Sequence, residues 1–227
     1  MDIITHHPDV YLGSIQPYEG GRPSAIAKRL VEGAVNLTPL GLEGDAQAEK
    51  SYHGGPDRAL CHYPREHYTH WQQQFPAQAE QFFAPAFGEN ISTLGMTEHS
   101  VFMGDIFRWG GALIQVTQPR SPCFKLNYHF AIDDISLLMQ QTGRCGWLYR
   151  VISTGEVSGD RPLELVTRNS DISVAEAISI AWHMPFDEEQ YRRLLAVTGL
   201  SASWSKTMLT RISSGKTEDF NRRLLGR

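Results

Sequence analysis

The sequence predicts a β-rich body of mixed α+β class, with a barrel as one form open to it, followed by a small all-α C-terminal part. Up to about residue 167, short apolar runs alternate with glycine and proline turns, which is typical of strands. Beyond residue 168, capped amphipathic segments take over. A length of 227 residues suits one medium and one small domain. We therefore expect two domains, residues 1–167 and 168–227.

In the first part, the best signal is the hairpin over 107–116, because Gly110-Gly111 between apolar-rich strands suits a primed turn. A helix over 134–141 is expected to start at Asp133 as N-cap and to stop at Gly143. The other predicted elements are strands over 10–15, 25–31, 36–40, 147–152 and 163–166, further strands within 88–107, and two short helices over 65–83 broken at Pro76.

In the second part, Ser173 and Glu176 form a capping box that opens a helix to about residue 183. Asp187 opens another, with Gly199 as its stop, and Ser201 caps a third. A last short helix is expected over 217–225.

The composition excludes several classes of protein. Twenty-one basic and 25 acidic residues give a net charge of −4, which argues against a nucleic-acid coat or a polybasic membrane binder. No apolar run approaches the roughly 18 residues of a membrane span, and no signal peptide is visible. Three cysteines without a C-x-x-C motif predict reduced thiols. We expect a cytoplasmic protein that binds neither nucleic acid nor membrane.

Cys123 has the most suggestive surroundings for chemistry. Pro119 and Pro122 stiffen the backbone around it, and Arg120 and Lys125 favour its thiolate form. A thiolate serves as a nucleophile or as a soft metal ligand. An inert structural cysteine is an equally good interpretation of the pattern alone. Cys61 and Cys145 lack such surroundings and are interpreted as structural.

Two glycine-rich segments, 41–45 and 53–59, carry charged residues between their glycines. Such loops can present backbone N–H groups to an anion, although tight turns with solvated charges explain them as well. Neither segment matches a phosphate-binding P-loop or a dinucleotide-binding fingerprint. His62, His67 and His70 suggest zinc, but no carboxylate or cysteine completes a recognised set with them.

These pieces, taken in order, resemble the MOSC domain, the module named after the C-terminal part of molybdenum-cofactor sulfurases. The tail resembles the three-helix domain of the bacterial YiiM-like subgroup of that family. The matching segments are Gly-Leu-Glu-Gly-Asp at 41–45, His-Gly-Gly-Pro-Asp-Arg-Ala at 53–59, Gly-Glu-Asn at 88–90, Gly-Asp at 104–105, Arg-Ser-Pro-Cys-Phe-Lys at 120–125 and Gly-Trp-Leu-Tyr-Arg-Val at 146–151.

The resemblance implies a β-barrel-like fold that binds the molybdenum cofactor, Mo-molybdopterin, with Cys123 as the metal ligand. It implies that Arg58, Arg120 and Lys125 balance the charge of the cofactor, and that Gly44, Gly54 and Gly55 let the backbone approach the pterin. It further implies hydrogen bonds to the pterin from Glu43, Asp45 and Asn90, and phosphate contacts from Arg22 and Ser24. His53 is the implied proton donor.

The implied activity is the two-electron reduction of small N-hydroxylated compounds, notably purine bases such as 6-N-hydroxylaminopurine, as a detoxification. The chain shows no flavin, haem or iron–sulfur motif, so a flavoprotein reductase is the expected electron donor. Two alternatives remain open. One is a cofactor-free thiol enzyme or sulfur carrier that uses Cys123. The other is a helix-turn-helix DNA-binding regulator. Ser205 argues against it, because with Gly199 as the turn glycine Ser205 falls near a position that should be buried and apolar.

Overall fold

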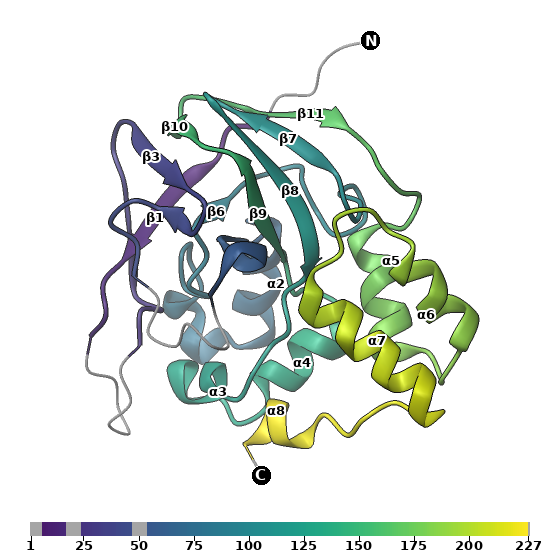
Figure 1. The fold of residues 1–227 in the computed structure, drawn as a ribbon. Coiled ribbons are helices and arrows are strands. Elements are labelled where there is room, and N and C mark those ends of the chain that lie inside the picture. The colour runs from purple at the N-terminus through teal and green to yellow at the C-terminus, as the bar shows by residue number, and fades with distance from the viewer. Residues whose placement is uncertain (1–5, 17–23, 47–53, 227) are drawn as a thin grey trace.

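The computed structural model describes residues 6–16, 24–46 and 54–226. Arg22 and His53 lie outside these ranges. A strongly curved sheet forms a half-barrel, with helices along one side and beneath one end (Figure 1). The predicted mixed α+β class is confirmed.

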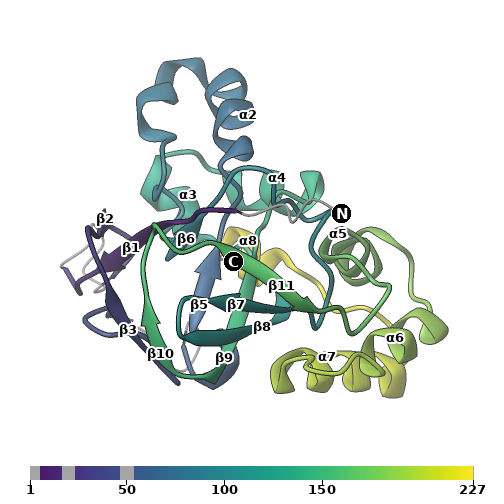
Figure 2. The same cartoon turned by 90° about the horizontal axis from the view of Figure 1, so that it is seen from above.

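Eight strands form the main sheet in the order β11-β7-β8-β9-β5-β6-β1-β2. All neighbours are antiparallel except β5 and β6. A second sheet, β10-β3-β4, covers part of the open side of this half-barrel, as Figure 2 shows from above. The strands are β1 (Asp9–Gly13), β2 (Lys28–Leu30), β3 (Val35–Thr38), β4 (Gly41–Leu42), β5 (Leu60–His62), β6 (Ile91–Ser92), β7 (Ile106–Trp109), β8 (Ala112–Pro119), β9 (Trp147–Ser153), β10 (Gly155–Val157) and β11 (Leu163–Thr167).

The predicted hairpin is confirmed as β7 and β8, with Trp109 opposite Ala112. Gly110 has φ +54°, and a Cβ atom there would lie 2.5 Å from the carbonyl oxygen of Glu156. Glycine is therefore needed at this turn for its conformation and for the close approach of β10.

Four short helical segments cover the lower end of the half-barrel around a second hydrophobic core that is rich in aromatic rings. They are α2 (Glu66–Gln74), the 3-10 helix η2 (Pro76–Gln81), α3 (Lys125–Phe130) and α4 (Ile135–Thr142). The predicted break at Pro76 is confirmed, whereas α3 was not expected. Asp133 as N-cap was wrong by one position: Asp134 precedes α4, and its side chain forms no capping bond. The stop at Gly143, in the left-handed region, is confirmed.

The tail forms α5 (Val174–Ile178), a π-helical turn η3 (Ser179–His183), α6 (Glu188–Leu195), α7 (Ala202–Ser214) and α8 (Asn221–Leu225). All three predicted caps are confirmed. Ser173, Asp187 and Ser201 accept bonds from the first turns of α5, α6 and α7. The helix α6 ends at Leu195, before Gly199, and α8 is shorter than predicted.

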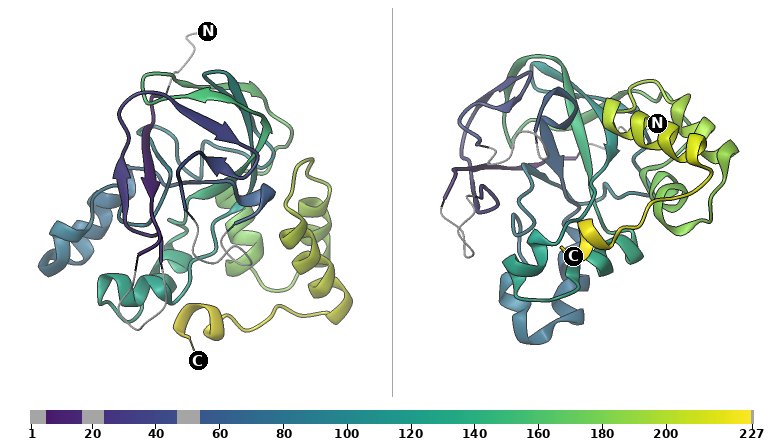
Figure 3. Two further views of the ribbon diagram at one scale, coloured as in Figure 1. Left: turned by 60° about the vertical axis from the view of Figure 1, so that its left-hand side comes forward. Right: turned by 60° about the horizontal axis from the view of Figure 1, so that its bottom comes forward.

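The tail helices pack directly against the sheet. One continuous core joins Trp109 and Ile114 of the sheet to Val174, Leu194 and Trp204 of the tail. Figure 3 shows α7 along the side of the half-barrel and α8 returning beneath it, near α3. Within the described residues, no helix combines the length and apolarity needed to cross a membrane.

Candidate functional site

Cys123 lies in the loop of residues 120–124, which joins the end of β8 to the start of α3. The loop is fixed at both ends: Arg120 N donates to Gly146 O at 3.0 Å, and Leu126 N donates to Cys123 O at 3.0 Å. Pro122 is buried, while Cys123 is partly exposed. The loop therefore holds a partly exposed cysteine between β8 and α3.

The guanidinium of Arg120 is the electrostatic centre of this region. Burial alone would lower its pKa, but the nearby acidic groups of Cys61, Glu89 and Cys123 raise that pKa above its ordinary value. Its Nη1 atom is buried and has no hydrogen-bond partner among the described residues. An unpaired buried donor is costly, so the site favours a ligand that supplies an acceptor.

Glu89, from the segment before β6, is the complementary group. It is fully buried, and Tyr68 Oη donates a hydrogen bond to Oε1, while Oε2 has no partner within the described chain. Burial raises the pKa of this carboxyl to about 7, against the opposing effects of Tyr68 and Arg120. The Gly-Glu-Asn motif at 88–90 pointed to this segment, but the burial of Glu89 was not predictable from it.

Cys61 on β5 also lies in this region. Burial raises the pKa of its thiol, while the charge of Arg120 and a hydrogen bond from it oppose that rise. The interpretation of Cys61 as a structural cysteine therefore misses its place beside Arg120. For Cys145 the structural interpretation is confirmed, because its buried thiol donates to Met139 O at 3.3 Å.

Asp45 and Asn90 were predicted to bind the pterin. In the structure they are hydrogen-bonded to each other. Lys28 Nζ lies 2.5 Å from Asp45 Oδ1, and both side chains are buried. Asn90 Nδ2 donates to Asp45 Oδ2 at 2.8 Å, and its Oδ1 accepts from Cys61 N at 3.2 Å. Their polar atoms have protein partners, so their contacts point to a role in supporting Cys61 and Glu89.

The other predicted residues within the described ranges are exposed or partly exposed. Glu43 and Gly44 are exposed, and Glu43 Oε2 accepts from Asn36 Nδ2 at 2.9 Å. Ser24 Oγ accepts from Ile26 N at 3.3 Å. Lys125 begins α3, two positions from Cys123, and is partly exposed, as are Gly54 and Gly55 before the short helix η1 (Pro56–Arg58).

The segment around Arg58 joins the sheet to the tail. Arg58 Nη2 donates to Ser203 Oγ at 2.8 Å, and burial lowers the pKa of this guanidinium. Asp57 pairs with Arg150 at 2.7 Å and accepts the backbone N–H of Ala202, at the start of α7, at 2.9 Å. This docking role was not predicted from the sequence, because it depends on a contact with a segment 145 positions away.

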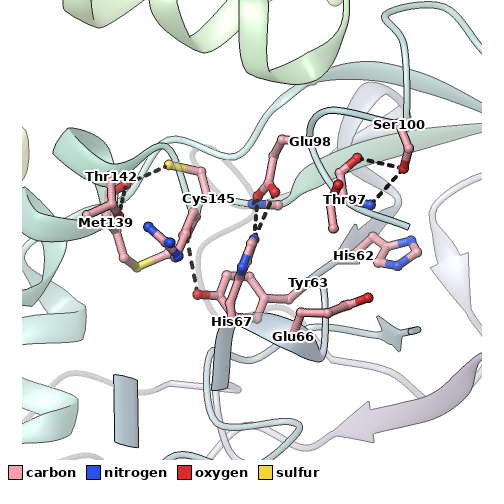
Figure 4. A network of polar contacts seen from close by, with 12 residues as sticks. His62, Tyr63, Glu66, His67, Thr97, Glu98, Ser100, Met139, Thr142 and Cys145 are labelled. Atoms are coloured by element: carbon pink, nitrogen blue, oxygen red, sulfur yellow. Dashed lines mark hydrogen bonds and ion pairs between the residues drawn. The ribbon is translucent and has the colours of Figure 1, made fainter. Parts of the chain in front are cut away.

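Two of the three histidines considered for zinc, His62 and His67, have hydrogen-bonding partners in the protein. His67 Nε2 lies 2.8 Å from Glu98 Oε2, and Glu98 Oε1 accepts from Gly146 N at 2.7 Å (Figure 4). Gly146 O in turn accepts from Arg120 N, so the pair of His67 and Glu98 supports the start of the Cys123 loop through Gly146. His62 lies between Tyr149 Oη and Thr93 Oγ1, and burial lowers its pKa to about 3.

In the part of the chain that the structure describes, no group of three or more His, Cys, Asp or Glu side chains is arranged to hold a metal ion.

The MOSC domain matches residues 49–164, which is just over half of the chain. The chain belongs to the MOSC domain family. A second match, to the YiiM-like, 3-alpha helix domain, covers residues 172–215 of this MOSC protein.

Relatives of this MOSC protein agree with both matches. Protein YiiM of Escherichia coli (strain K12) is 68% identical over 219 residues, which cover 96% of this chain and 98% of that protein. The crystal structure of YiiM from Escherichia coli superimposes with a TM-score of 0.87 at 60% identity, covering 98% of this chain and 100% of that one. A protein named "Reductase" from Gibberella moniliformis (strain M3125 / FGSC 7600) is 37% identical over 146 residues, covering 64% of this chain and 26% of that protein.

Proposed function

We propose that this chain binds the molybdenum cofactor at Cys123, Arg120 and Glu89 and reduces small N-hydroxylated compounds, N-hydroxylated purine bases among them. The observation that carries the proposal is a partly exposed cysteine near the buried Arg120, together with two buried, unpaired polar atoms of opposite kind, Arg120 Nη1 and Glu89 Oε2. Membership of the MOSC family supports the choice of cofactor, and the relative named "Reductase" supports the class of reaction.

The residues present suit this cofactor. Molybdopterin carries anionic groups, for which Arg120 offers a charged donor, and ring N–H groups, for which Glu89 offers an acceptor. The thiolate of Cys123 is the soft ligand that such a metal accepts. Lys125 adds positive charge two positions from Cys123.

The molybdenum centre, when bound, supplies the electron pair that converts R–NHOH and two protons into R–NH2 and water. The chain orients the substrate and manages its protons. With a pKa of about 7, Glu89 holds a proton in part of the molecules at neutral pH and so suits a proton donor. His53, the donor expected from the sequence, stays a second proposal. We propose a flavoprotein reductase as the source of electrons and the cytoplasm, where the three free thiols would stay reduced, as the location.

The test compares Cys123→Ser with Cys145→Ser, whose thiol is buried and bonded to the backbone. Each protein is made in cells that produce the cofactor, its molybdenum and pterin contents are measured, and N-hydroxylaminopurine reduction is driven by reduced viologen. We expect Cys123→Ser to lose about 100-fold or more in rate per bound cofactor, because a serine hydroxyl is a poor ligand for this metal. Cys145→Ser should stay within a few-fold of wild type.

Wild-type turnover by Cys123→Ser would contradict the assignment of the metal ligand. A wild-type protein that contains no molybdenum, yet shows Cys123-dependent thiol chemistry, would favour the cofactor-free thiol enzyme instead.

A further inference from the structure

The C-terminal segment reaches the Cys123 loop from the far end of the chain. The helix α8 (Asn221–Leu225) follows α7 after a short connection and packs against α4. The match to the three-helix domain ends at residue 215, so α8 lies outside both matched regions. Nothing in the family matches assigns this segment a role.

Arg223 forms one hydrogen bond with the residue before Cys123 and one with the residue after it. Its Nη1 donates to Pro122 O at 2.5 Å, and its backbone carbonyl accepts from Phe124 N at 2.8 Å. Its Nη2 donates to Gln140 Oε1 on α4. The Cys123 thiol is close enough to interact electrostatically with this guanidinium. One residue therefore ties the peptide units before and after Cys123 to a neighbouring helix.

The segment that carries Arg223 is itself anchored. Leu224 is buried, and its carbonyl oxygen accepts from Asn127 Nδ2 at 3.0 Å and from Ser136 Oγ at 2.6 Å. The Arg223 guanidinium also lies over the ring of Trp182, 5.4 Å from its centroid. We call Arg223 and its bonds to Pro122, Phe124 and Gln140 the clamp. The contacts of Leu224 and Trp182 fix this clamp against α3, α4 and η3, so that it can hold the loop in one conformation.

We propose that Arg223 is a positioning residue that holds the Cys123 loop and thereby completes the site from the C-terminal segment. The catalytic part of this proposal rests on the proposed function, whereas the hold on the loop does not. Small errors in the placement of a reacting group are expensive, since about 1 Å can cost on the order of 100-fold in rate. A clamp on both sides of the thiol prevents such errors.

The test compares Arg223→Ala with Arg222→Ala, a matched control whose side chain is exposed. Amide hydrogen exchange of Phe124 is measured on the purified full-length proteins. The variant keeps the backbone carbonyl that accepts from Phe124 N but loses the charged bond to Pro122 O, so the loop should open more often and Phe124 should exchange at least about tenfold faster. Arg222→Ala should match wild type. Exchange within twofold of wild type in Arg223→Ala would overturn the proposal.

Activity provides the second arm. At equal molybdenum content we expect Arg223→Ala to lower kcat by about 10- to 100-fold with KM near wild type, and Arg223→Lys to recover part of the loss. An unchanged kcat would overturn the catalytic part. If Arg223→Ala does not fold, Gln140→Ala removes the second acceptor of the clamp. It should speed Phe124 exchange in the same direction, and no change there would overturn the proposal.

The two proposals fail separately. An inactive, molybdenum-free wild-type protein would refute the proposed function, and the exchange measurements would still decide whether Arg223 holds the loop.

Discussion

Replacing Glu89 with glutamine removes one titrating carboxyl from the site and keeps its shape. The variant retains an oxygen that can accept the bond from Tyr68 Oη. In the wild type, burial raises the pKa of Glu89 from 4.5 to about 7. The folded state therefore keeps a proton that the unfolded chain releases between these two values. As the pH rises through this window, the unfolded state gains and the wild-type protein loses stability.

The size of the effect follows from the shift. At about 1.4 kcal/mol per pKa unit, the rise predicts a loss of about 3 kcal/mol between pH 4.5 and pH 7, and no further loss above it from this group. The loss is absent in Glu89→Gln. Other titrating groups are common to both proteins and largely cancel in the difference. The free energy of unfolding of the variant minus that of the wild type should thus increase by about 3 kcal/mol across the window.

Urea unfolding between pH 4 and pH 8 measures this difference. Both proteins should come from cells that do not make the cofactor, since a bound ligand would add its own linkage. Parallel pH profiles, with a difference that stays constant within about 1 kcal/mol, would contradict the raised pKa of Glu89. Glu89 would then not be held in its protonated form by burial, and its proposed role as a proton donor would lose its support.

Two further substitutions test the framework of the site. Asp57→Ala removes both the ion pair with Arg150 and the acceptor at the start of α7, and should lower the free energy of unfolding by about 1–2 kcal/mol in urea. Gly146→Ala would place a Cβ 2.1 Å from His62 O. The control is Gly33→Ala, because Gly33 also has a positive φ but has open space around it. Gly146→Ala should lower the free energy of unfolding by at least about 2 kcal/mol more than this control. Equal midpoints for the two glycine variants would contradict this account of the loop support.

Local signals explain what the sequence predicted well. The caps at Ser173, Asp187 and Ser201 depend on bonds over two or three positions, and the hairpin depends on two adjacent glycines. Such features are determined within a few residues, so they can be read before the fold is known. The choice of Asp133 over Asp134 shows the limit of this approach, because two adjacent aspartates offer the same local signal.

The parts of the site that were missed depend on distant contacts. Cys61 lies next to Arg120 because β5 pairs with β9, which in turn pairs with β8. Glu89 is notable only because the fold buries it, and Arg223 because α8 returns to the loop. Arg58 was expected to balance the charge of a cofactor, whereas its observed contact connects the sheet to α7. Sequence motifs therefore suggested a region, and the fold shows which of its side chains lie together.

The clamp between Arg223 and Pro122 joins positions that are 101 apart in the chain. The ribosome releases the Cys123 loop long before it makes α8, and chains fold from the N-terminus as they emerge. Until α8 emerges, the loop thus lacks one of its supports. A product cut short after residue 215 would contain both regions that match known domains and still lack this support. Any cofactor that needs the finished loop can therefore be inserted only after α8 has emerged and packed against that loop.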